Sequence, residues 1–422
     1  MMERLTLKNG LELILNPMEG YNSVTTGIWI RTGSRYESEK ESGSAHFLEH
    51  LLFKGTKKRT CEELKRLVEG VGGSFNAFTS EETTCYYVKM PFAKYLTLSL
   101  DVLSDMVGSP SLPSEEIERE RNVILEEIKM YQDIPAAYVH ELFHGLVFPN
   151  HPLGRFIAGT PETVGGLTRD SLHNYWQRFY KAKSLVLSIA GNFDSVQARN
   201  EAVVFFQSIP QGQSLSFLPA TEKEPGPGFS LLTKETEQVH FCLGGRAFSD
   251  EDERRWPLSL LTVVLGGNMS SRLFVEVREK RGLAYQISAG AATLVDTGFF
   301  VIDAGTSIAT LKEALKIILG EISRIKEEKV PEEELSRAKD FVVGQFRLRL
   351  ESTSEYMNFL GGQLATRRRI ENPEEIIAKI KAVTSEEIKS VARQILQREN
   401  LNLALIGPKA SQEGIPEIIQ TQ

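Results

Sequence analysis

The chain contains an internal repeat that limits the folds open to it. Residues 167–191, LTRDSLHNYWQRFYKAKSLVLSIAG, show the same helix, turn and strand pattern as residues 383–407, VTSEEIKSVARQILQRENLNLALIG, which lie 216 positions later. A helical pattern opened by Pro113 likewise has a counterpart opened by Pro331. Repeats of this length indicate duplicated domains and not a solenoid. We therefore expect two domains of similar architecture within the 422 residues.

Each half mixes strand and helix patterns. Alternating segments such as residues 27–31 and 299–303 stand among helical patterns of about 10 to 20 residues. This mixture predicts an α+β fold with two duplicated domains, each a largely antiparallel sheet with helices packed on one face. Residues 222–228, EKEPGPG, contain the proline and glycine that interrupt helices and strands. The expected division is an N-terminal domain at 1–219, a linker at 220–228 and a C-terminal domain at 229–422.

The segment His46-Phe-Leu-Glu49-His50 is a candidate metal-binding motif. A helix turns about 100° per residue, so the two imidazoles and the carboxylate share one face, opposite Phe47 and Leu48. Two neutral imidazoles four positions apart suit tetrahedral Zn²⁺, and the neighbouring carboxylate can hold a water and take its proton. A solvated helix face produces the same pattern, so the motif needs a third ligand from elsewhere.

A candidate third ligand lies in the later helical pattern at residues 114–132. Its apolar stripe, which begins at Ile117, includes Glu120 and Glu127. Buried carboxylates require a partner, which is either a metal or a basic side chain in an ordinary salt bridge. Glu126 lies about 180° from Ile117 and is expected to face water. We therefore expect Glu127 to be the ligand and Glu120 to orient a ligand through a hydrogen bond.

Taken together, these residues resemble the pitrilysin and mitochondrial-processing-peptidase group of metallopeptidases, often called inverzincins. The resemblance covers nearly the whole chain and includes the 76 residues that separate His50 from Glu127. It implies a zinc metalloendopeptidase that binds one Zn²⁺ per chain through His46, His50 and Glu127. In this interpretation Glu49 is the general base and Glu120 supports the ligands.

Two further segments resemble substrate-binding elements of the same group. The segment GGSFNAFT resembles its edge strand, which implies that Asn76 and Ala77 bind an extended peptide as an added strand. From the residues alone, an interior strand after a glycine turn is equally consistent. The segment REKRGLAY resembles a substrate clamp of Arg278 and Tyr285, which without the resemblance are a surface arginine and a packed tyrosine.

The second half of the repeat lacks the metal ligands. Glu120 and Glu127 are matched there by Ala338 and Gln345. The counterpart of the first motif, at residues 258–267, contains no metal-binding side chain. Only the first half is therefore expected to bind zinc.

A rival motif, His140-Glu141-Leu-Phe-His144, matches the commoner His-Glu-x-x-His pattern of zinc peptidases. Gly145 is expected to end its helix, and no helix shortly downstream offers a carboxylate within an apolar stripe. We interpret this segment as a structural helix.

Composition excludes several other classes of protein. The net charge of −7 and the lack of a long basic cluster argue against a nucleic-acid partner. Three cysteines, an odd number, predict no disulfide framework and a reducing compartment. No stretch approaches 18 uninterrupted apolar residues, and the N-terminus alternates around Asn9-Gly10 as a hairpin does. We expect a cytoplasmic protein without a membrane partner.

The resemblance also implies an assembly. Group members of this size resemble half of a four-domain chamber, so a homodimer or a heterodimer with a related subunit is expected, with Arg278 and Tyr285 serving the opposite subunit. Some subunits of the group are non-catalytic structural or peptide-binding partners. The complete ligand set in the first half favours the enzyme over that alternative.

Overall fold

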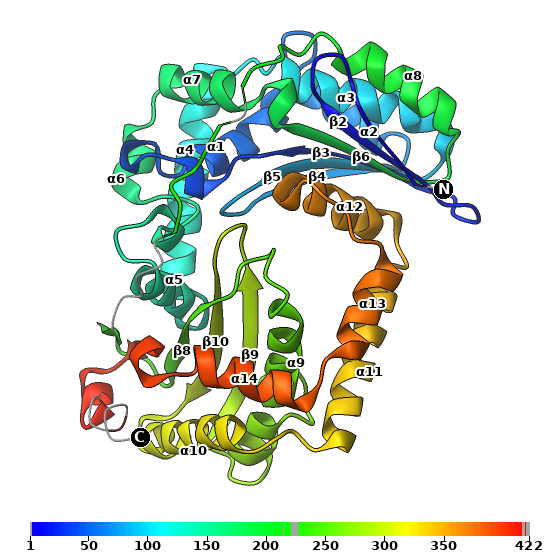
Figure 1. Ribbon diagram of the computed structural model, residues 1–422. Coiled ribbons are helices and arrows are strands. Elements are labelled where there is room, and N and C mark those ends of the chain that lie inside the picture. The colour runs from blue at the N-terminus through cyan, green and yellow to red at the C-terminus, as the bar shows by residue number, and fades with distance from the viewer. Residues whose placement is uncertain (1, 214, 221–226, 416–417, 419–422) are drawn as a thin grey trace. The chain divides into compact units, whose positions relative to one another are not determined.

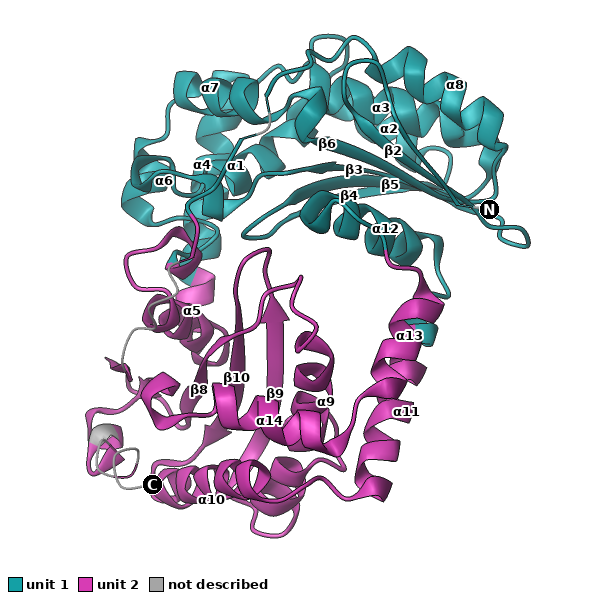
Figure 2. Ribbon diagram, in the orientation of Figure 1, with its two compact units in different colours: residues 1–129, 155–218, 347–370 teal, residues 130–154, 219–346, 371–422 magenta. Residues whose placement is uncertain are grey.

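The computed structural model describes residues 2–213, 215–220, 227–415 and 418 of the chain. The chain folds into two compact units, which Figure 2 shows in different colours. Each unit is assembled from separate stretches of sequence around its own β-sheet. Unit 1 comprises residues 1–129, 155–218 and 347–370, and unit 2 comprises residues 130–154, 219–346 and 371–422.

Among the described residues, the sheet of unit 1 has six strands in the order β1-β2-β6-β3-β5-β4. Neighbouring strands are antiparallel except β2 and β6, which are parallel. Every residue of β3 and β6 is buried, because helices cover both faces of the sheet. The strands are β1 (Glu3–Thr6), β2 (Glu12–Pro17), β3 (Val24–Ile30), β4 (Ser74–Thr79), β5 (Thr84–Met90) and β6 (Leu185–Gly191).

Most helices of unit 1 pack on one face of this sheet around a large apolar core. Helix α12 lies on the opposite face of the sheet (Figure 1). Its Met357, Leu360 and Leu364 pack with Trp29 and Cys85 of the sheet. The helices are α1 (Ser44–Leu51), α2 (Cys61–Glu69), α3 (Leu96–Gly108), α4 (Ser114–Asp133), α6 (Pro161–Gly166), α7 (Arg169–Phe179), α8 (Ser195–Phe206) and α12 (Thr353–Arg367).

The sheet of unit 2 has the strand order β7-β11-β8-β10-β9 within the described residues. Only β7 and β11 are parallel there. The strands are β7 (Phe229–Thr233), β8 (Val239–Ala247), β9 (Ala284–Thr293), β10 (Gly298–Thr306) and β11 (Asn402–Gly407). The helices are α5 (Pro135–Val147), α9 (Arg255–Gly266), α10 (Ile308–Glu327), α11 (Glu332–Arg349), α13 (Pro373–Ala382) and α14 (Ser385–Ile395).

The two sheets repeat one topology. In unit 1 the strand order β2-β6-β3-β5-β4 matches β7-β11-β8-β10-β9 in unit 2, with the single parallel pair at the same place. Helix α7 and strand β6 precede α14 and β11 by the 216 positions of the sequence repeat. The predicted α+β class with two largely antiparallel sheets is therefore confirmed.

Two helices depart from the expected arrangement, because each packs on the sheet of the other half of the sequence. Helix α5 belongs to unit 2, where Val139 and Phe143 pack with Cys242 and Ile406 of its sheet, and α12 belongs to unit 1. Each sheet has a second apolar face that must be covered, so helices lie on both faces and not on one as predicted. The compact units consequently differ from the expected continuous domains at 1–219 and 229–422, and residues 221–226 of the expected linker lie outside the described residues.

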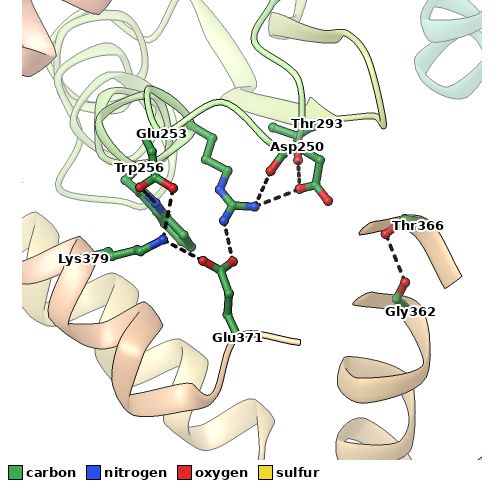
Figure 3. A network of polar contacts seen from close by, with 9 residues as sticks. Asp250, Glu253, Trp256, Thr293, Gly362, Thr366, Glu371 and Lys379 are labelled. Atoms are coloured by element: carbon green, nitrogen blue, oxygen red, sulfur yellow. Dashed lines mark hydrogen bonds and ion pairs between the residues drawn. The ribbon is translucent and has the colours of Figure 1, made fainter. Parts of the chain in front are cut away.

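A polar network in unit 2 joins α9 to the start of α13 (Figure 3). The buried guanidinium of Arg255 donates to the carboxylates of Asp250 and Glu371. The ammonium group of Lys379 lies 2.7 Å from Glu371 and 3.0 Å from Glu253. Because each buried charge meets an opposite charge, the network holds the two helices together without an unpaired ion.

The hairpin expected at the N-terminus is present. Strands β1 and β2 form an antiparallel hairpin around Asn9-Gly10, where Gly10 has a φ of +93°. The three cysteines, Cys61, Cys85 and Cys242, are free thiols. In the described part of the chain, no helix has both the length and the apolar character needed to cross a membrane.

The close approach of α12 to the sheet can be tested at Gly361. A methyl group there would lie 2.2 Å from Nε1 of Trp29, so Gly361→Ala should destabilise unit 1 by about 1–3 kcal/mol through overpacking. Gly165→Ala is the matched control, because nothing lies within 4 Å of a methyl group at that position of α6. Thermal unfolding should separate the two variants, and equal stability would contradict the packing of α12 described here.

Candidate metal centre

Helix α1 presents the polar face that the sequence predicts. Phe47, Leu48 and Leu51 are fully buried in the core of unit 1, which fixes the rotation of the helix. His46, Glu49 and His50 are carried by the other side. The rings of the two histidines meet edge to face with their centroids 4.8 Å apart.

Helix α4 brings Glu127 to the two histidines. Its Oε2 lies 3.8 Å from Nε2 of His46 and 3.7 Å from Nε2 of His50. Glu126 is 72% exposed and pairs with Lys129, whereas the side chain of Glu127 is only 29% exposed. The structure therefore brings Glu127, and not Glu126, to the two histidines, as the helical stripe predicts.

These three residues fit a divalent metal. Among the described residues they form the only group of three or more potential ligands, with all ligand atoms within 4.8 Å of one another. Ligands at about 2.0–2.2 Å from tetrahedral zinc stand about 3.3–3.6 Å from each other, close to the observed separations from Glu127. Two imidazole nitrogens and one carboxylate oxygen are also a donor set typical of catalytic zinc.

Burial favours the neutral form of the His46 imidazole, which is the form that binds a metal. Burial, and then the neighbouring His50, lower the pKa of His46 to about 4. The imidazole is therefore neutral near pH 7 and keeps a lone pair for a metal. Its Nδ1 is buried and has no hydrogen-bond partner in the described structure, so no hydrogen bond at this nitrogen fixes the orientation of the ring.

His50 is oriented by a chain of polar contacts. Its Nδ1 lies 2.9 Å from Oε2 of Glu120, the residue predicted for this role. Nζ of Lys54 lies 2.6 Å from the other oxygen of Glu120. Burial raises the pKa of Glu120, but the hydrogen bonds with Lys54 and His50 outweigh it and the pKa is lowered. An ionised Glu120 holds the proton on Nδ1 of His50 and leaves Nε2 free for a metal.

Lys54 was missed in the sequence interpretation. It stands four residues after His50, in the short helical turn Leu52–Lys54 that continues α1. That spacing places it on the same side as His50 and is the signal that could have identified it.

Glu49 is held by a hydroxyl group from strand β4. Oγ1 of Thr79 donates to Oε2 of Glu49 at 2.6 Å. Burial raises the pKa of Glu49, which the hydrogen bond from Thr79 opposes. A raised pKa suits a group that must take up a proton. Thr79 was also missed, although it ends the strand that the resemblance identified.

Strand β4 is an edge strand, which settles the alternative left open by the sequence. It pairs only with β5 within the described residues. The N–H of Ser80 donates to the carbonyl of Thr83 at the turn, and hydrogen-bonded pairs alternate along an antiparallel ladder. The backbone groups of Phe75, Ala77 and Thr79 therefore point away from β5, toward the open edge.

Asn76 covers part of this open edge. Its side chain is exposed, and its Oδ1 accepts a hydrogen bond of 2.8 Å from the N–H of Ala77. The outward-facing donor of Ala77 is thus satisfied inside the strand.

Arg278 and Tyr285 form a pair in unit 2. The guanidinium carbon of Arg278 lies 5.1 Å from the ring centroid of Tyr285 and 4.7 Å from that of Phe274. Tyr285 is 75% exposed at the start of β9 and is not the packed residue that its sequence alone indicated. Because both residues belong to unit 2, their role toward the site in unit 1 stays a prediction.

The rival motif lies on α5, in unit 2. His144 packs edge-on against Phe299, with ring centroids 4.7 Å apart, and burial followed by His140 lowers its pKa to about 4. No third ligand joins the two histidines in the described residues. The helix does not end at Gly145 as expected but continues to Val147, because this face packs on the sheet.

Comparisons with known proteins find relatives along most of the chain. Residues 14–161 match the family model described as Insulinase (Peptidase family M16), and residues 166–342 match the one described as Peptidase M16 inactive domain. An uncharacterized zinc protease of Streptomyces coelicolor is 36% identical over 96% of this chain and 90% of its own length. An uncharacterized zinc protease of Bacillus subtilis is 36% identical over 97% of this chain and 99% of its own length.

Solved structures show the same fold. A protease from Helicobacter pylori superimposes with a TM-score of 0.90 at 24% identity and covers 97% of this chain and 99% of its own. A Pseudomonas fluorescens structure titled as a peptidase M16 inactive domain gives the same TM-score at 18% identity, covering 97% of this chain and 98% of its own.

The ligand assignment predicts a difference between two adjacent glutamates. Glu127→Gln should reduce bound zinc below about one tenth of an equivalent per chain after dialysis, because the amide replaces the charged ligand. Glu126→Gln should retain the wild-type content. Elemental analysis of both proteins measures this, and equal loss or equal retention would contradict the assignment.

Lys54 predicts a charge-dependent effect on zinc affinity. Lys54→Met should weaken zinc binding about tenfold, as is typical for the loss of a group that supports a ligand, whereas Lys54→Arg should stay close to wild type. Competition with a chromophoric chelator measures both affinities. Wild-type affinity in the methionine variant would show that Lys54 does not act through Glu120.

Proposed function

Because the chain belongs to peptidase family M16, we propose that it is a zinc-dependent endopeptidase that cleaves extended, unfolded peptides. The observation that carries this proposal is the convergence of His46, His50 and Glu127, with Glu49 beside them on α1. Their donor set matches one Zn²⁺ per chain with an open position. The zinc protease names of the relatives agree with this metal.

Each residue of the site has a separate role in the proposed reaction. Bound zinc supplies a Lewis acid that polarises the scissile carbonyl and makes water more acidic. Glu49 accepts the proton of the attacking water and later delivers it to the leaving amine. Glu120 and Lys54 keep His50 in the tautomer that leaves Nε2 free, and Thr79 restrains the carboxylate of Glu49.

The open edge of β4 supports the choice of substrate. An extended peptide can pair with the outward-facing backbone groups of Phe75, Ala77 and Thr79 as an added antiparallel or parallel strand. Binding then requires the side chain of Asn76 to release the N–H of Ala77. Most backbone groups of a folded protein are already paired within its own helices and sheets, so the proposed substrates are unfolded segments. Thr79 contacts Glu49, which places this edge beside the proposed base.

The assembly and the location of the protein belong to the same proposal. We assign Arg278 and Tyr285 to substrate contact, with these residues serving the site of the opposite subunit in a homodimer or in a heterodimer with a related chain. The exposed Tyr285 beside the cationic Arg278 supports a contact role. The proposed location is the cytoplasm, without nucleic-acid or membrane partners.

The alternative is a non-catalytic structural or peptide-binding subunit of such a complex. The second half of the chain, which overlaps the model described as an inactive domain, has Ala338 and Gln345 in place of the two glutamates. The first half keeps the complete set, with the ligand atoms close together. This difference between the halves favours the enzyme.

Exchange of the proposed base tests the function. Glu49→Gln should lower the rate of peptide cleavage by about 10²- to 10⁴-fold while zinc stays bound, because the amide cannot accept the proton. Glu141→Gln, the same change in the rival motif, should keep wild-type activity.

The assay uses an unfolded peptide library, mass spectrometry of the products and a chelator control. Cleavage that survives in Glu49→Gln but disappears in Glu141→Gln would overturn the site. A wild-type chain that binds zinc and peptides without cleaving them would favour the non-catalytic alternative.

A further inference from the structure

The first turn of α1 has no capping side chain of its own. The first N–H groups of a helix lack partners within the helix, and a side chain at the N-cap usually supplies one. Here the N-cap is Gly43, which has a φ of +94° and no side chain. The following residues Ser44 and Ala45 are buried, so water does not satisfy these donors. Unpaired buried N–H groups would destabilise this start of the helix.

Glu37 supplies the missing acceptors from outside the helix. One carboxylate oxygen accepts from the N–H of Gly43 at 2.8 Å, and the other accepts from the N–H of Ala45 at 2.7 Å. Glu37 is only 3% exposed, and its own carbonyl accepts from Arg155 at 3.0 Å. A carboxylate at a helix N-terminus also interacts favourably with the helix dipole.

The position of this contact ties it to the metal centre. Ala45 directly precedes His46, and α1 has only eight residues, so the N–H groups fixed by Glu37 lie within about two turns of all three functional side chains of the helix. A change of rotation at the first turn moves His46 directly, and within the described part of the chain its Nδ1 has no hydrogen bond to restrain the ring.

We propose that Glu37 is a positioning residue that fixes the first turn of α1 and so sets His46 for zinc binding. This inference rests on the zinc site of the proposed function. Burial raises the pKa of Glu37, whereas the N–H donors of Ala45 and Gly43 favour its ionised form and oppose that rise. The role assigned here depends on the two accepted hydrogen bonds and not on the titration of Glu37.

Gly43 reinforces the same arrangement. A side chain at this position would adopt a strained left-handed conformation, and its Cβ would lie 2.7 Å from the carbonyl oxygen of Ala158. The start of α1 therefore cannot gain an ordinary side-chain cap, and the acceptors must come from Glu37.

The test compares Glu37→Gln with Glu41→Gln. In Glu37→Gln the amide keeps one acceptor but turns an NH₂ group toward a backbone donor, so one N–H loses its partner. Glu41 belongs to the same segment, but its carboxylate accepts from Ser38 and Arg178 and makes no hydrogen bond to α1 within the described residues. Zinc affinity, measured by chelator competition, should fall about tenfold or more in Glu37→Gln and stay at the wild-type value in Glu41→Gln.

Hydrogen exchange separates this role from a general structural one. In the zinc-free proteins, the amides of residues 44–51 should exchange at least about tenfold faster in Glu37→Gln, while those of β3 and β6 keep their protection. Wild-type zinc affinity with unchanged exchange in α1 would overturn the proposal, as would a loss of protection spread evenly over unit 1. Neither readout requires peptide cleavage, so a wild-type protein that fails to cleave peptides would count against the proposed function alone.

Discussion

The contact between α1 and α4 is the constraint on which the site depends. Two imidazoles and a carboxylate are brought together in a partly buried place, where desolvation penalises every charged form. The core residues Phe47, Leu48 and Leu51 hold α1 at one rotation, and the isoleucine stripe of α4 does the same for Glu127. Burial of apolar side chains thus sets the separations of the ligand atoms, and a divalent metal can balance the polar groups left facing one another.

Polar contacts behind this cluster complete the arrangement. Glu120 and Lys54 support His50, Thr79 supports Glu49, and Glu37 supports the helix that carries both. Thr79 belongs to the edge strand with the outward-facing backbone, so the proposed base and the proposed peptide-binding edge share one residue. All of these groups lie in unit 1, and the repeat in unit 2 keeps the sheet topology without the ligands.

The sequence predicted those features that follow from local periodicity. A turn of about 100° per residue was enough to place His46 and His50 on one face and to choose Glu127 over Glu126. The duplication was visible because helices and strands recur at a constant interval. The sequence interpretation missed the roles of Lys54 and Thr79, because their partners Glu120 and Glu49 are distant in sequence and only the fold brings them close. The packing of α5 and α12 on the sheet of the other half of the sequence was missed for the same reason. Helix α5 also continues past Gly145, where the glycine predicted its end, because this face of the helix packs on a sheet.

Anomalous diffraction from crystals of the zinc-loaded protein, collected on both sides of the zinc absorption edge, tests the central claim most directly. The account predicts one strong anomalous peak per chain, at bonding distance from Nε2 of His46, Nε2 of His50 and a carboxylate oxygen of Glu127. A peak beside His140 and His144, or no peak between α1 and α4 at saturating zinc, would contradict it.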